Sequence, residues 1–383
     1  MRDCDSIHVI NCFTAGVIRM KSIFKKDELT KRERVLNTLL HRELDRVAIH
    51  EQLSFNPGVI SMYTGKKIDG FDYTLEDIGK VISMTLDMAF VFFPPCGTDQ
   101  YTDEYGFVFK NDNWTRWHVS RPFADEHGAA IWFAKFIANI KNELKRFDAD
   151  AYRHDYHARM KNYHEFAGDT VILDICTTGF CEAYDRMGLE IYAYFLEEYA
   201  EMLKEYMEVS TDLAVKRAKA VGPAGYDPVI LIAEDFSSKR GPIFNPDFLK
   251  KYHFPYVKRL TAAWHDNGFH VIYHSDGNYK TAIPELIACG VDGFYCLEPN
   301  AGMDVVELKN AYPQMAWAGG IDGVDLLERG SPDEVKAEVF RQILETDALR
   351  TGGMFLASSS EINPTVKPEN FRAMIEAADL MRN

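Results

Sequence analysis

Short apolar runs recur along the chain, and amphipathic segments separate most of them. The runs cover residues 46–51, 88–93, 171–176, 229–234, 270–274, 293–297, 315–319 and 354–357. Continuous apolar strands that alternate with amphipathic helices are typical of a parallel sheet with helices on both faces. Eight such units favour a closed barrel over an open doubly wound sheet. The sequence therefore predicts an α/β fold, a (β/α)8 TIM barrel, as a single domain over residues 1–383.

Several helix starts are recognisable from their capping residues. Thr30 and Glu33 are spaced as a capping box ahead of apolar positions at helical intervals. Asp304 precedes another predicted helix, and Ser331 with Pro332 begins a third. Residues 1–29 are interpreted as an N-terminal extension with helical character. Its apolar patch at residues 7–18 follows acidic residues and has no small-residue cleavage site, so a signal peptide is not expected.

One connection is too long for a simple crossover helix. Residues 96–169 separate the second and third runs and are interpreted as an insertion. It contains hairpin-like segments at 105–109 and 114–118, followed by a mixed stretch at 152–164. We expect the insertion to form a lid or wall over the barrel mouth, because long ordered loops are often functional. The alternative is a surface excursion with no catalytic part.

Composition narrows the classes of partner. The hydrophobic fraction of 46% suits a large core, and the formal net charge of −15 argues against nucleic acid as a partner. The seven cysteines contain no CxxC pair, which argues against a disulfide framework and a thiolate zinc knuckle. No apolar run approaches the roughly 18 residues that span a bilayer. We therefore expect a cytoplasmic protein with reduced thiols and a small-molecule ligand.

The segment His274-Ser275-Asp276-Gly277-Asn278 is the strongest indication of chemistry. It closes an apolar run, and residues i and i+2 of a strand point to the same face, so His274 and Asp276 are predicted to converge. An imidazole and a carboxylate held together can bind a metal or pass a proton. The alternative for Asp276 is a helix cap, since aspartate is a favoured N-cap residue.

Other polar residues stand at the ends of the remaining runs, where (β/α)8 enzymes place their chemistry. They are His50, Glu51, Asp174, Glu234, Asp235, Glu298, Asp322 and Glu361. Packed carboxylates persist only when they are paired, protonated or bound to a cation. Glu234 and Asp235 face opposite sides of a strand, and the sequence leaves open which one enters the site. Glu298 is equally consistent with a turn residue, and Asp322 with a loop cap.

A set of weak motifs resembles the uroporphyrinogen decarboxylase superfamily through its order and spacing. The motifs are Arg32-Glu33-Arg34-Val35-Leu36, Asp45-Arg46-Val47, Asp103-Glu104-Tyr105-Gly106, Glu234-Asp235-Phe236, Pro255-Tyr256-Val257-Lys258-Arg259, His274-Ser275-Asp276-Gly277, Gly290-Val291-Asp292-Gly293, Gly320-Ile321-Asp322 and Pro368-Glu369-Asn370. The resemblance covers most of the chain after about residue 30. It implies the same (β/α)8 barrel, and it is closest to the corrinoid-dependent methyltransferase branch.

The resemblance also implies a metal site. The methyltransferase branch binds zinc through a His-x-Cys pair and a later cysteine; here His274 matches the histidine and Asp276 replaces the first cysteine. The later position falls near Ser360, beside Glu361. The resemblance thus implies zinc or another divalent metal held by His274, Asp276 and Glu361, a corrinoid carried on a separate partner protein, and a homodimer.

The leading hypothesis is a methyltransferase that moves a methyl group between a small substrate and a corrinoid protein or a thiol or folate carrier. Asp235, Glu298 and Glu234 are the candidates for acid–base roles, and His50, Asp174 and Asp322 for substrate binding. The decarboxylase branch of the superfamily carries an arginine-rich segment that the sequence after residue 51 lacks. A metal-free decarboxylase acting on a smaller acid, and a barrel that binds a ligand without turnover, are the alternatives.

Overall fold

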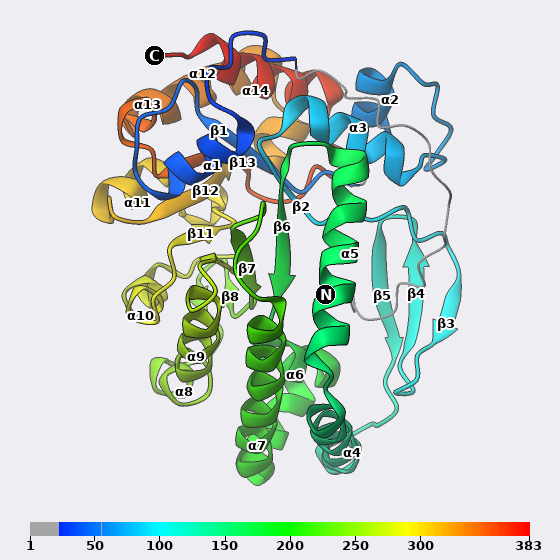
Figure 1. Ribbon diagram of the computed structural model, residues 1–383. Coiled ribbons are helices and arrows are strands. Elements are labelled where there is room, and N and C mark those ends of the chain that lie inside the picture. Colours follow the sequence, from blue (N-terminus) through cyan, green and yellow to red (C-terminus); the bar gives the residue numbers. More distant parts are fainter. Residues whose placement is uncertain (1–22, 55) are drawn as a thin grey trace.

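A closed barrel of parallel strands forms the centre of the molecule in the computed structural model, which describes residues 23–54 and 56–383 (Figure 1). Around the barrel the strand order is β1 (Ala48–Glu51), β13 (Met354–Ser358), β12 (Ala316–Ile321), β11 (Gly293–Tyr295), β10 (His270–His274), β7 (Val229–Ala233), β6 (Val171–Cys176) and β2 (Met88–Phe90). Each of these strands coincides with or overlaps one of the apolar runs. The predicted (β/α)8 barrel is therefore confirmed.

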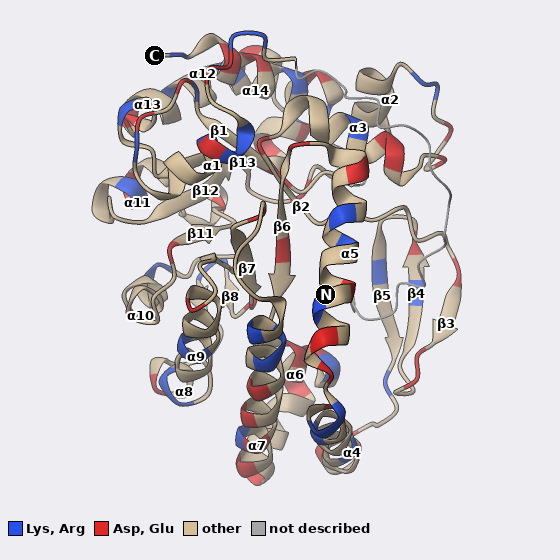
Figure 2. Ribbon diagram, viewed as in Figure 1, with Lys and Arg blue, Asp and Glu red and all other residues tan. Residues whose placement is uncertain are grey.

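Helices surround the barrel and connect its strands. Among the described residues they are α1 (Lys31–Leu39), α2 (Pro57–Thr64), α3 (Leu75–Thr85), α4 (Glu126–Arg146), α5 (Ala149–Ala167), α6 (Phe180–Met187), α7 (Leu189–Val221), α8 (Pro246–Tyr252), α9 (Phe254–His265), α10 (Ile283–Ala288), α11 (Val305–Ala311), α12 (Pro332–Glu345), α13 (Ala348–Thr351) and α14 (Pro368–Leu380). Both predicted capping boxes are present, at Thr30 and Ser331. Charged residues of both signs are spread over outer helices such as α5 and α7 (Figure 2).

The long connection between β2 and β6 holds a small sheet and two helices. The sheet is antiparallel and consists of β3 (Gln100–Thr102), β4 (Val108–Asp112) and β5 (Thr115–Ser120). Helix α5 packs between α3 and α7, where a barrel helix is expected. Helix α4 and the segment after the sheet pack against α6 and α7: the ring of Phe133 contacts that of Tyr206, and Arg121, just after β5, donates to the carbonyl oxygen of Arg186. We call α4 and this sheet the wall; in Figure 1, α4 lies near α6 and α7, and the sheet stands beside α5.

Two hydrophobic clusters reflect the alternation of side chains along the barrel strands. The inner cluster fills the barrel with residues such as Ala48, Leu231, Ile272 and Tyr295. The outer cluster joins the other faces of the strands to the helices. A residue's position within a strand therefore decides whether it faces the barrel interior or the helix layer.

At the amino-terminal end of the barrel, Arg34, Arg46 and Asp87 form a fully buried cluster of charges. The capacity to cross a membrane is a separate property of the fold. Among the described residues, no helix combines the length and the apolar character needed to cross a membrane. The apolar patch at residues 7–18 lies outside the described residues.

Candidate functional site

Strand alternation sorts the polar residues at the carboxyl ends of the strands into two groups. Tyr295 belongs to the inner cluster, and His274 is its direct partner in the β10–β11 register. His50, Asp235 and Asp276 have the same inward parity on their strands or just beyond them. Glu51, Asp174 and Glu234 have the opposite parity and face the helix layer. The inward group therefore supplies the site.

His274 stands at the centre of the inward group, between two carboxylates. Its Nε2 lies 3.4 Å from Asp235 Oδ1 and 3.7 Å from Asp276 Oδ1. The backbone N–H of Asp276 donates to Asp235 Oδ1 at 2.9 Å, which fixes the two acidic side chains relative to each other. Asp276 is more than half exposed, whereas His274 is largely buried. Asp276 is not the N-cap of the short helix that follows, where Tyr279 stands, and its carboxylate lies beside the imidazole.

The charges in this cluster change the protonation of its members. Burial opposes protonation of His274, but Asp235, Asp276 and Glu361 outweigh that effect and raise the pKa of His274 to about 9. Partial burial raises the pKa of Asp276; His274 opposes this shift, and the neighbouring carboxylates Asp235 and Glu298 reinforce it. Burial works against ionisation of Asp235, yet contact with His274 leaves its pKa below the ordinary value. The cluster carries more acidic groups than cationic ones.

A third donor atom completes a set that could hold a metal ion. Ligand atoms of His274, Asp276 and Cys296 all lie within 4.8 Å of one another. Cys296 follows β11, is fully buried, and donates from Sγ to the carbonyl oxygen of Ser359 at 2.5 Å. Sequence reasoning missed this cysteine. The available signal was its place at the end of an apolar run, two residues before Glu298.

Glu298 and Glu361 border the cluster. Glu298 Oε1 accepts the backbone N–H of Gly277 at 2.6 Å and so holds the loop that carries Asp276. Glu361 lies after β13 and acts on His274 through its charge. Its carboxylate is outside the set of donor atoms within 4.8 Å.

The carboxylates that face the helix layer form hydrogen bonds with other parts of the chain. Glu234 accepts from the backbone N–H of Thr178 at 2.6 Å and from that of Cys181 at 2.8 Å, at the start of α6. Glu51 accepts from the N–H and hydroxyl of Ser358, at 2.7 and 2.6 Å, and burial raises its pKa to about 8. These contacts fix neighbouring strand exits.

Two of the residues predicted to bind substrate are likewise engaged outside the His274 cluster. Asp174 forms a two-pronged ion pair with Arg159 of α5, at 2.9 and 2.8 Å. Asp322 accepts the backbone N–H groups of Val324 and Asp325 at 2.9 and 2.6 Å, as a loop cap does. The third, His50, is fully buried with its ring centroid 4.8 Å from that of Tyr295.

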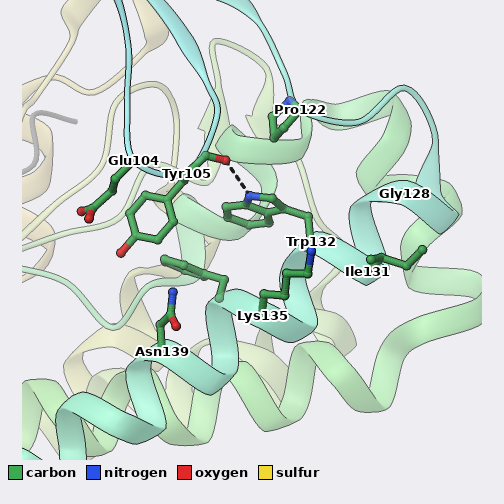
Figure 3. A pocket seen from close by; sticks show the side chains of 9 residues that line it. Glu104, Tyr105, Pro122, Gly128, Ile131, Trp132, Lys135 and Asn139 are labelled. Atoms are coloured by element: carbon green, nitrogen blue, oxygen red, sulfur yellow. Dashed lines mark hydrogen bonds between the residues drawn. The ribbon is translucent and has the colours of Figure 1, made fainter.

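A surface pocket of about 490 Å³ lies in the wall formed by α4 and the small sheet (Figure 3). Its lining residues are Glu104, Tyr105, Pro122, Gly128, Ile131, Trp132, Lys135, Phe136 and Asn139. Trp132 Nε1 donates to the carbonyl of Tyr105 at 3.0 Å, which ties α4 to the loop before β4. The pocket shares no residue with the His274 cluster.

Comparisons with known proteins relate the chain to one family and one fold. The uroporphyrinogen decarboxylase (URO-D) family model matches residues 176–380, just over half of the chain. The methylcobamide:CoM methyltransferase MtbA of Methanosarcina acetivorans is 23% identical over 172 residues, which are 45% of this chain and 47% of that protein. The match thus spans about half the length of this curated relative. A methyltransferase structure from Methanosarcina mazei superposes with a TM-score of 0.63 over 92% of this chain and 99% of its own, at 18% identity.

Proposed function

Because the chain belongs to the uroporphyrinogen decarboxylase family, we propose that it is a metal-dependent methyltransferase of that family. It would move a methyl group between a small substrate and a corrinoid protein or a thiol or folate carrier. The observation that carries the proposal is the donor set of His274, Asp276 and Cys296 at the carboxyl ends of β10 and β11. Similarity to MtbA and to the Methanosarcina mazei methyltransferase supports it.

The cluster fits a divalent cation by both geometry and charge. The donors are one imidazole nitrogen, one carboxylate oxygen and one sulfur, a combination that zinc accepts readily. His274 is the cation that the structure pairs with Asp235 and Asp276, and Glu361 adds a further negative charge nearby. A divalent cation bound to His274 would displace the imidazole proton and offset this excess of negative charge. We propose that His274 and Asp276 bind the metal, with Cys296 or Glu361 as the third ligand.

A divalent cation bound here would act as a Lewis acid on the heteroatom that carries the methyl group. The residues around it have separate roles in the proposal. Asp235 orients His274 and the backbone of Asp276, and Glu298 fixes Gly277 beneath them. Asp235 and Glu298 are the acid–base candidates for the proton that the leaving heteroatom takes up. His50 faces the substrate from inside the barrel.

The proposal places the corrinoid on a separate protein; the name of the relative MtbA, a methylcobamide:CoM methyltransferase, supports the corrinoid itself. The chain's net charge of −15 favours a partner whose docking face is basic. Pairing of two copies of this chain is a further part of the proposal that rests on the family resemblance alone.

Metal content is the direct test of the site. We expect purified wild-type protein to hold about one equivalent of zinc, because three donors of suitable type converge. His274→Ala and Asp276→Ala should each lose it, as measured by elemental analysis after gel filtration. His270→Ala is the matched control, since His270 lies at the opposite end of the same strand and should leave the metal in place. Wild-type protein that stays metal-free after incubation with zinc would contradict the proposal.

Methyl transfer tests the reaction itself. Metal-loaded protein should convert cob(I)alamin to methylcob(III)alamin in the presence of a suitable methyl donor, and a chelator should abolish the absorbance change. Carbon dioxide release from a small acid that continues with chelator present would instead identify a metal-free decarboxylase. Tight ligand binding without turnover, unchanged by His274→Ala, would identify a binding protein.

A further inference from the structure

Three buried polar atoms in the barrel interior have no hydrogen-bond partner among the described residues. They are His50 Nε2, the Tyr295 hydroxyl and His274 Nδ1. Their rings are neighbours, because the Tyr295 centroid lies 4.8 Å from that of His50 and 5.4 Å from that of His274. Buried polar side chains are nearly always hydrogen-bonded, so three such atoms in one place call for an explanation.

These residues form a path from the mouth of the barrel to its interior. The side chain of Asp276 is 59% exposed and that of His274 is 16% exposed. Tyr295 is 1% exposed and His50 is fully buried. The inner wall beside them is built of small side chains, including Ala233, Ala318 and Ala357. The unpartnered atoms therefore lie next to the His274 cluster, on the side that faces the barrel interior.

The hydrogen bond at Nδ1 of His50 determines whether the unpartnered Nε2 is a donor or an acceptor. Nδ1 lies 3.2 Å from the carbonyl oxygen of Met88, which can only accept, so Nδ1 carries the proton. Nε2 then presents a lone pair to the barrel interior. Burial lowers the pKa of His50 to about 4, which is consistent with a neutral ring at neutral pH.

Tyr295 contributes a group that can both donate and accept. A phenol hydroxyl carries one proton to donate and lone pairs that can accept. An acceptor nitrogen beside a hydroxyl is complementary to a group that donates one hydrogen bond and accepts another. A substrate hydroxyl has these properties.

We propose that His50 and Tyr295 form a recognition subsite for an uncharged hydroxyl group of the substrate, immediately inside the His274 cluster. An anionic carboxylate could not donate to His50 Nε2, and it would also face Asp235, Asp276 and Glu361. The subsite therefore selects hydroxyl-bearing methyl donors over acids of the same size. The inference rests on the proposed function in one respect: it places the substrate's methyl group beside His274 and its hydroxyl group beside His50 and Tyr295.

Protein stability provides the first test, since it needs no ligand. Tyr295→Phe removes a hydroxyl that has no partner, so the melting temperature should stay the same or rise. Tyr273→Phe is the matched control: this tyrosine is also fully buried, but its hydroxyl lies 2.7 Å from His253 Nε2. Tyr273→Phe should lower the melting temperature by about 2 °C or more. An equal loss in both variants would show that the Tyr295 hydroxyl is satisfied in the free protein and would overturn the proposal.

Binding provides the second test, with three probes that share one methyl ether. The probes are 2-methoxyethanol, 1,2-dimethoxyethane, which lacks the donor, and methoxyacetate, which is an anion. Ligand-observed NMR titration of zinc-loaded wild-type protein should show the alcohol binding about threefold to tenfold more tightly than the diether, with the acid weakest. Tyr295→Phe should lose the preference for the alcohol, and Tyr273→Phe should keep it. Equal binding of the three probes, or no detectable binding of the alcohol, would overturn the proposal.

The two hypotheses fail in different ways. Repeating the titration after chelation separates them, because the subsite lies inside the metal cluster and its hydroxyl preference should persist without zinc. If the protein neither holds zinc nor transfers methyl groups but still prefers the alcohol, the proposed function is refuted and the subsite is supported. Methyl transfer with no effect of Tyr295→Phe on donor preference would refute the subsite and leave the proposed function standing.

Discussion

Adjacent residues at the end of one strand have different surroundings because a strand turns successive side chains to opposite faces. Glu234 is fully buried among backbone N–H groups and threonine hydroxyls at the start of α6. Asp235 faces the barrel mouth and contacts His274. We therefore assign Glu234 to holding the loop before α6, and Asp235 to the site.

This assignment predicts opposite effects for two conservative substitutions. Glu234→Gln should lower the free energy of unfolding by about 2 kcal/mol, because hydrogen bonds to a buried charged acceptor are weakened. Asp235→Asn should change stability by less than about 1 kcal/mol but lower the rate of methyl transfer at least about tenfold, an effect of about 1.4 kcal/mol on the barrier. Urea unfolding and the cobalamin assay measure the two effects. Equal loss of stability in both variants would refute the division of roles.

At the scale of elements, the conformation of the loop after β10 depends on contacts with the segments that follow the two neighbouring strands, β7 and β11. Gly277 has a φ of +76°, and its N–H donates to Glu298 beyond β11. A Cβ atom at Gly277 would lie 2.7 Å from the backbone carbonyl of Ser238 in β8 (Ser237–Ser238), which pairs with β9 (Gly241–Pro242). The position of Asp276 therefore depends on a close approach between two loops.

Gly277→Ala should combine backbone strain with a collision and lower the free energy of unfolding by about 2 to 4 kcal/mol. Gly65→Ala is the control that isolates strain, since Gly65 also has a positive φ, of +72°, but nothing lies within 4 Å of its added Cβ. That control should lose only about 1 kcal/mol. Gly277→Ala should also weaken zinc binding, whereas Gly65→Ala should not. Chemical unfolding and a zinc titration measure both effects, and similar results for the two glycines would contradict this reading of the loop.

At the scale of the whole molecule, the two ends of the barrel carry different kinds of charge cluster. The carboxyl ends collect an acidic group around His274, whereas the amino ends close with ion pairs. Asp87 lies 2.6 Å from both Arg34 and Arg46, and all three side chains are fully buried. A paired cluster of this kind stabilises the fold only while every member keeps its charge.

Asp87→Asn should therefore lower the free energy of unfolding by about 3 to 5 kcal/mol, because it leaves two guanidiniums with less compensation. Asp325→Asn is the exposed control, since its ion pair with Arg329 is open to solvent and should be worth less than about 1 kcal/mol. Urea unfolding at pH 7 measures both. A similar small effect for the two variants would show that the cluster adds little.

The same cluster predicts an acid response. Burial opposes ionisation of Asp87, but Arg46 and Arg34 hold its pKa below the usual value, so the unfolded chain binds the proton more readily. This contribution is complete above the unfolded pKa of about 4 and is lost as the pH falls below it. The difference in stability between wild type and Asp87→Asn should therefore shrink between pH 5 and pH 3. A constant difference over that range would argue against the ion pair as its source.

The sequence by itself determined the barrel and the central pair of the candidate site. Eight apolar runs, most of them separated by amphipathic segments, predict a parallel sheet covered by helices. The i, i+2 spacing of His274 and Asp276 places them on one face of a strand. Both patterns are readable from the local sequence. The capping boxes at Thr30 and Ser331 are local for the same reason. Period-two alternation likewise places Glu234 and Asp235 on opposite faces of their strand, but it leaves open which face meets the barrel interior.

Only the tertiary structure decided which residues meet across strands. Cys296 joins His274 and Asp276 because β11 lies beside β10, and Tyr295 reaches His50 because the sheet closes on itself. The engagement of Asp174 with Arg159 likewise depends on a helix from the long connection packing against the barrel. Contacts between segments far apart in sequence depend on barrel closure and register, and no local pattern of residues records them.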